Sequence, residues 1–153
     1  MGIRQHVDEW LAAHGETVIG WRRHFHTHPE LSHQERHTTE FITTVLREHG
    51  MTPTLFPTTG LMVDIGPGVG PRIAFRADLD ALPIEETAPV AFRSASPGVM
   101  HACGHDVHTA IVLALACALN TYPLDRWASF YFPTGGGSHG GWRARCDYLG
   151  RVE

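Results

Sequence analysis

The residue types most capable of chemistry in this sequence lie together at residues 100–108, MHACGHDVH, directly before a long apolar stretch. Cys103 is expected at or just before the first turn of a helix, where unpaired backbone N–H groups and the positive end of the helix dipole favour a thiolate. His105 follows two residues later and can reach the same ion. A thiolate with an imidazole indicates a transition-metal site, and Zn, Mn, Fe and Co are all compatible with it.

A structural explanation competes with this one. His101, His105 and His108 are spaced to share one polar face of a helix start, and Cys103 could be a small buried side chain. A single histidine would favour that explanation. A Cys-x-His pair with further His and Asp neighbours, in a chain with 3 cysteines, favours metal ligation by Cys103 and His105. We expect supporting or structural roles for the other two histidines.

Two carboxylates, Asp78 and Asp80, follow a predicted strand at residues 72–76. Strand ends are where α/β folds place their sites, and in an extended chain both side chains would face one way. A solvated turn capped by aspartate is the alternative. The Cys-x-His segment favours a site role, because a carboxylate beside a metal-bound imidazole orients that imidazole and tunes the bound water.

The helices that would support these residues can be predicted from apolar spacing. Residues 3–11 and 18–25 predict two helices, the second of them ended by Pro29. Ser32 and Glu35 have the spacing of a capping box and predict a helix that ends at Gly50. Residues 104–120 are apolar almost all round, as expected of a helix packed inside an α/β layer.

Two short strands are predicted at residues 61–65 and 72–76, with the Gly/Pro-rich turn 66–71 between them. Their short connection favours a hairpin. Together with the helices, they predict an α/β fold.

Composition excludes several classes of protein. The chain has 153 residues, 42% of them hydrophobic and 18% charged, which is ordinary for a globular protein with one core. A formal charge of −4 without a basic patch argues against nucleic acid as a partner, and no basic amphipathic or long apolar segment indicates a membrane. Three cysteines without a paired framework fit reduced thiols, so a cytoplasmic location is expected.

Three segments resemble the N-terminal signatures of the metal-dependent amidohydrolases, which include hippurate hydrolase, N-acyl-amino-acid amidohydrolases and auxin-conjugate hydrolases. They are residues 21–35 (WRRHFHTHPELSHQE), 75–83 (FRADLDALP) and 100–108 (MHACGHDVH), in this order. The resemblance covers roughly residues 18–125. It implies the N-terminal part of a zinc-exopeptidase-like α/β catalytic domain, incomplete in this chain, with a dimerisation lid inserted later.

The resemblance also implies chemistry. Two divalent metal ions (Mn, Zn or Co) would activate a water that attacks the acyl carbonyl of an N-acyl amino acid or short peptide, while a Glu takes its proton. Cys103 and His105 would be metal ligands, and Asp80 the catalytic-site carboxylate that orients a ligand or the water. Asp78 stands where related peptidases place a histidine ligand. The family often pairs through the lid, so a homo-oligomer is left open here.

The sequence departs from the family pattern after the apolar helix. The family continues with a strand ending in Gln-Pro-Ala-Glu-Glu, whose two Glu residues supply the base and a ligand, and with two later His ligands. This chain reads FYFPTGGGSHGG at residues 130–141 and has no paired carboxylate there. A phosphate loop is a weak explanation of the glycines, since no Gly-Lys-Ser/Thr follows.

A frameshift explains the departure. One set of codons for residues 129–138, read from its second base, encodes Arg-Phe-Ile-Phe-Gln-Pro-Ala-Glu-Glu. The family motif reappears in this frame because the first base of each of its Gln, Pro, Ala and Glu codons is fixed by the residues of this chain, and each one matches. We therefore predict a native portion at residues 1–126 and an out-of-frame tail at residues 127–153, in which His139 and Cys146 have no role.

This hypothesis predicts little or no hydrolase activity for the chain itself, because losing members of a cooperating catalytic set costs many orders of magnitude in rate. It also predicts exposed apolar surface and aggregation where later elements should pack. The alternative function is a non-catalytic module for metal binding or subunit association that keeps Cys103 and His105. A histidine-rich metal buffer is less favoured, because the 12 histidines are not clustered in tracts.

Overall fold

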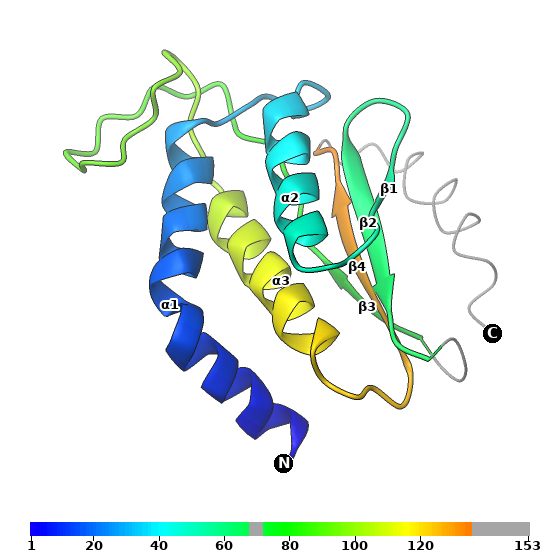
Figure 1. The fold of residues 1–153 in the computed structure, drawn as a ribbon. Helices are drawn as coiled ribbons and strands as arrows, with labels where there is room; N and C mark the ends of the chain where they lie inside the picture. Colours follow the sequence, from blue (N-terminus) through cyan, green and yellow to red (C-terminus); the bar gives the residue numbers. More distant parts are fainter. Residues whose placement is uncertain (68–71, 136–153) are drawn as a thin grey trace.

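A computed structural model describes residues 1–67 and 72–135 of the chain, and in it three helices cover one face of a four-stranded sheet (Figure 1). The α/β class predicted from the sequence is confirmed. The elements are α1 (Ile3–Thr27), α2 (Arg36–Glu48), β1 (Thr54–Leu55), β2 (Gly60–Ile65), β3 (Arg72–Arg76), α3 (His105–Asn120) and β4 (Trp127–Pro133).

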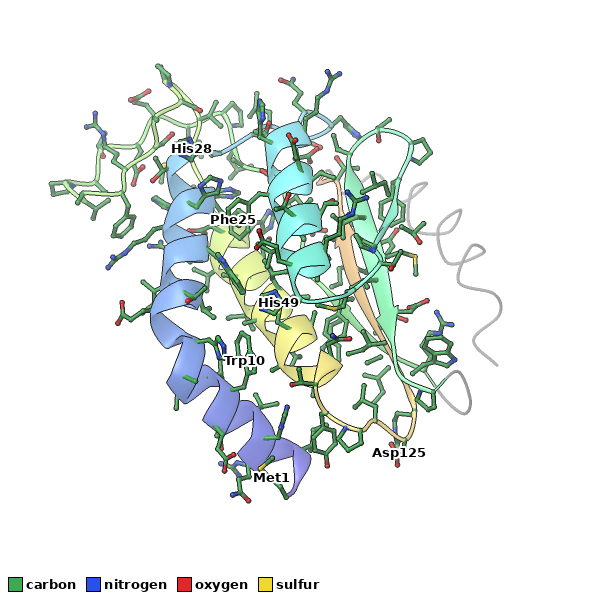
Figure 2. All side chains as sticks on the ribbon, in the orientation of Figure 1. Met1, Trp10, Phe25, His28, His49 and Asp125 are labelled. Atoms are coloured by element: carbon green, nitrogen blue, oxygen red, sulfur yellow. The ribbon has the colours of Figure 1, made fainter. Side chains whose placement is uncertain are left out.

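The first helix is continuous, and the prediction of two separate helices was wrong. Trp10 and Phe25, which belong to the two predicted helices, project from α1 toward the other helices (Figure 2). His14 lies between these apolar patches and stacks on Trp10 with ring centroids 4.2 Å apart. The two patches share one helical phase, so one long helix packs along α3, with Phe25 of the second patch buried and Val7 and Trp10 of the first partly buried.

The capping box was also predicted wrongly. The N-cap of α2 is Glu35, and neither it nor Ser32 makes a capping hydrogen bond. The carboxylate of Glu30 takes over this task, because it accepts hydrogen bonds from the backbone N–H groups of His37 (3.1 Å) and Thr38 (2.8 Å). A carboxylate that reaches back from the preceding loop satisfies the same free amides as a local cap does.

The strand order replaces the predicted hairpin. The order is β1-β2-β4-β3, so β4 separates β2 from β3; it pairs antiparallel with β2 and parallel with β3. The short connection between β2 and β3 suggested that they pair directly. The more apolar β4 takes the central position instead, because a central strand is buried on both faces.

Strand β4 lies inside the segment predicted to be out of frame. Phe130 and Phe132 are fully buried, and their side chains belong to the core between the sheet and the helices. Phe130 also stacks on Phe75 of β3, with ring centroids 5.2 Å apart. Residues 136–153, which contain His139 and Cys146, lie outside the described residues.

Helix α3 forms at the predicted position and lies between α1 and the sheet (Figure 1). Leu113 and Cys117 on it are fully buried, whereas Ile111 is 57% exposed. None of the helices within the described residues is long and apolar enough to cross a membrane.

Candidate functional site

The predicted site residues meet where the carboxyl ends of β3 and β4 approach the start of α3. After β3 the chain continues beside β4, with hydrogen bonds from Ala77 N to Tyr131 O (3.1 Å) and from Leu79 N to Pro133 O (3.3 Å). An antiparallel bridge between Leu82 and Met100 then closes the long loop that follows. Asp80 and His105, 25 residues apart in sequence, are thereby brought together.

Asp80 and His105 are in direct contact. Nδ1 of His105 donates to the backbone oxygen of Asp80 at 2.8 Å and lies 2.9 Å from Oδ1 of its carboxylate. A neutral imidazole with its proton on Nδ1 keeps the lone pair of Nε2 for a metal. This is the arrangement by which a carboxylate fixes the tautomer and ring orientation of a ligand histidine. Asp80 is buried, whereas the His105 side chain is 22% exposed.

Cys103 is an exposed, free thiol just before α3. The intervening Gly104 is the N-cap and has φ +81°, a left-handed conformation that glycine adopts without strain. Cys117 is not a second candidate, because burial raises the pKa of its thiol to about 12. Within residues 1–67 and 72–135, no three His, Cys, Asp or Glu side chains are arranged to hold a metal ion.

The structure separates the two aspartates. Asp78 forms an ion pair with Arg76 at 2.7 Å, and its backbone oxygen accepts a hydrogen bond from Thr109 Oγ1 at 3.2 Å. Asp80 alone of the two contacts His105 in the part of the chain that the structure describes. Asp78 therefore helps to hold the strand extension, and Asp80 is the carboxylate at the predicted ligands.

A third histidine, His101, is 5% exposed and lies among charged neighbours. Burial lowers its pKa from 6.5 to about 4; attraction by Asp106 opposes this change, and repulsion by His105 and His26 adds to it. His101 is consequently a neutral imidazole at physiological pH.

Sequence reasoning missed how Ser32 and Glu35 act at this site. The fully buried Glu35 carboxylate accepts hydrogen bonds from Thr59 Oγ1 (2.7 Å), Thr134 Oγ1 (2.8 Å) and Gly135 N (2.9 Å). Ser32 Oγ donates to the backbone oxygen of Gly135. Both residues therefore hold the end of β4, and their capping-box spacing gave no signal of this.

Gly135 lies directly against Asp80. A Cβ atom added at residue 135 would be 1.6 Å from Cγ of Asp80, so a side chain here requires the Asp80 carboxylate to move. The end of β4 therefore limits the space available to the Asp80 carboxylate, which contacts His105.

A second group of residues that the sequence did not reveal joins α1 to the start of α3. Nδ1 of buried His26 lies 2.8 Å from Oδ2 of Asp106, and its Nε2 lies 2.9 Å from Oε1 of Glu86. Arg22 Nε is 2.9 Å from the same Asp106 oxygen. His26 stands in the first signature segment, whereas nothing in the sequence singled out Glu86.

Comparisons with known proteins identify relatives of this chain. Residues 74–126 match the family model of peptidase family M20/M25/M40. An N-acyl-L-amino acid amidohydrolase of Geobacillus stearothermophilus is 52% identical over 101 residues, which make up 65% of this chain and 27% of the relative. The crystal structure of a dinuclear metal-binding M20 peptidase from Bacillus subtilis matches 93% of this chain and 42% of its own, with 39% identity and a TM-score of 0.85.

The chain belongs to the M20 peptidase family. The resemblance to metal-dependent amidohydrolases is confirmed, and the fold corresponds to part of an M20 domain. A longer Rhodococcus jostii protein that carries the name of a glutamate–cysteine ligase is 50% identical over 107 residues, or 69% of this chain and 14% of that protein. In all three pairwise comparisons this M20 chain spans less than half of the other protein.

Proposed function

We propose that this chain carries the N-terminal part of the active site of an M20 hydrolase that cleaves amide bonds of N-acyl amino acids or short peptides. Cys103 and His105 would bind a divalent metal ion, and Asp80 would orient His105. The observation that carries this proposal is the paired contact of His105 Nδ1 with the backbone oxygen and carboxylate of Asp80.

The donor set fits a divalent transition metal. His105 presents Nε2, and the exposed Cys103 thiol lies at the positive end of the α3 dipole, which favours the thiolate. Mn, Zn and Co are the proposed metals, and the Bacillus subtilis relative is described as dinuclear. Such a metal supplies Lewis-acid activation of a carbonyl group and of water.

We also propose that residues 127–153 are read out of frame and that this chain has little hydrolase activity of its own. The printed sequence has no paired carboxylate after β4 to act as base and ligand. The shifted reading restores that pair and keeps phenylalanine at the buried positions 130 and 132. Because these core side chains are the same in both readings, β4 can pack as the central strand in either case.

A non-catalytic role in metal binding or subunit association is the second candidate. It is favoured for this molecule by the same missing carboxylates, since two ligands alone hold a metal without completing a catalytic set. Under either candidate the partner would be a metal ion and a small molecule, with no nucleic acid or membrane. The cytoplasmic location stays a prediction.

Cobalt(II) is a suitable probe, because thiolate–cobalt bonds give intense charge-transfer absorption. The full chain is titrated with cobalt in a Cys146→Ala background, which leaves Cys103 and the buried Cys117 as the thiols. We expect a thiolate band that disappears in Cys103→Ser and weakens in His105→Asn. A band unchanged in Cys103→Ser would refute the metal site.

Activity and coding sequence separate the two candidates. Hydrolysis of N-acetyl amino acids with added Mn, Zn or Co should be undetectable for this chain. A fresh nucleotide read from the codon of Asp125 onward, translated in all frames, should show Gln-Pro-Ala-Glu-Glu followed by the two His ligands. Turnover by the purified chain would contradict the inactivity, and the absence of such a frame would leave the binding role in its place.

A further inference from the structure

We propose that His26 is a positioning residue for the metal-binding turn at residues 103–105, a role that rests on the function proposed above. Among the described residues, His26 does not contact Cys103. It acts through Asp106, the residue that directly follows His105. The supporting observation is the buried chain of contacts from α1 to α3 through one imidazole ring.

The ring of His26 lies between two carboxylates. Both ring nitrogens lie within 2.9 Å of carboxylate oxygens. Arg22 Nη2 also lies 3.5 Å from Nδ1, the nitrogen that faces Asp106. Burial raises the pKa of Glu86, but hydrogen bonds from Ser94 N and from His26, with the charges of His26 and Arg93, outweigh burial and lower it. Glu86 is therefore ionised.

The same group of residues brings ionisable side chains together in the interior. Arg22 and His26 both contact Asp106, and His26 also contacts Glu86. His26, Glu86 and Asp106 are all buried, so removing one partner leaves an unpaired charge away from water. This makes the arrangement stiff, because no member can turn away without that cost.

The start of α3 has no side-chain cap of its own. The N-cap is Gly104, which has no side chain to accept from the first amides of the helix. Asp106 stands in the first turn, but its carboxylate points to His26 and Arg22. The first turn, which carries His105, is therefore anchored to α1 through Asp106 as well as to the strand extension through Asp80.

The second nitrogen of His26 extends the control to the loop between the site segments. Glu86 lies near the beginning of the loop that runs from Leu82 to Met100, and its other oxygen accepts from Ser94 N at 2.6 Å. Asp106 lies just beyond the end of that loop. The His26 ring thus links both ends of the loop that separates Asp80 from Cys103.

The test uses cobalt(II) alone as the probe and the full chain in the Cys146→Ala background. His26→Gln removes the ring that reaches both carboxylates, and Asp106→Asn keeps the shape of the other partner. Asp64→Asn is the matched control, because Asp64 binds Arg72 (3.2 Å) and Ser129 on β2, β3 and β4 rather than the α3 start. Thermal unfolding is recorded for each variant.

We expect His26→Gln and Asp106→Asn each to weaken cobalt binding by about 10- to 100-fold, the usual effect of losing an outer partner of a metal ligand. Asp64→Asn should lower the melting temperature without changing cobalt affinity or the thiolate band. If one of the two test variants does not fold, the other still decides the proposal.

Two contrary results are distinguishable. Wild-type affinity and an unaltered thiolate band in a folded His26→Gln or Asp106→Asn variant would overturn the positioning role and leave the metal site intact. A parent chain that shows no thiolate band at all would overturn the metal site, and the role of His26 with it.

Discussion

Protonation of the buried His101 imidazole is expected to destabilise the folded chain as the pH falls. Burial lowers the pKa of His101 from 6.5 to about 4 in the folded state, with Asp106 opposing this change and His105 and His26 adding to it. Between these two values the unfolded chain binds the proton more tightly than the folded chain does. The free energy of unfolding therefore rises with pH across this window.

The magnitude follows from the shift. A difference of 6.5 against about 4 gives a contribution of about 3 kcal/mol, at 1.36 kcal/mol for each pKa unit. It is present in full above pH 6.5 and is lost as the pH falls toward 4. Against the 5–15 kcal/mol that is typical of a small domain, this is roughly a fifth to three fifths of the stability.

The contribution of His101 to the free energy of unfolding can be measured by urea unfolding. The metal-free chain and its His101→Leu variant are compared at neutral pH and near pH 4. Leucine cannot bind the proton, so the difference in unfolding free energy between the two proteins should change by about 3 kcal/mol across the window. His37→Leu controls for the loss of an exposed imidazole. A His101→Leu profile parallel to that of the parent chain would refute the reasoning, because it would mean that His101 titrates alike in both states.

Two further substitutions test the packing around the site. Glu35→Gln removes one acceptor oxygen and should cost about 1–3 kcal/mol in urea unfolding, with Thr134→Val as the partner variant. Phe130→Ala should cost about 3–5 kcal/mol, and a loss below about 1 kcal/mol would argue against β4 at the sheet centre.

Much of the framework could be predicted from the sequence. The apolar run at residues 104–120 specified α3 because an uninterrupted run of that length has few alternatives to a buried helix. The three signature segments indicated the M20 resemblance, and local spacing singled out Cys103 and His105. Asp80 was recognised through its place after a strand. The structure then brought Asp80 to His105, as a carboxylate that orients a histidine would be.

The errors share one cause. Residues near in sequence were expected to act on each other, as in the hairpin of β2 with β3 and the capping box of Ser32 with Glu35. In the structure β4, some 50–70 residues later in the chain, separates the strands, and Glu35 turns to Gly135, 100 residues away. Tertiary packing overrides such local pairings when it buries more apolar surface and satisfies more polar groups.

By itself, the sequence determined the positions of α2, α3, β2 and β3, the family and the residues with the chemistry of metal ligands, because these depend on local spacing and residue type. Only the tertiary structure decided the strand order, the task of Glu35 and the link from His26 to Asp106, which are 80 residues apart. A buried carboxylate or imidazole must find its partner wherever the folded chain provides one. Spacing along the chain carries no record of that choice.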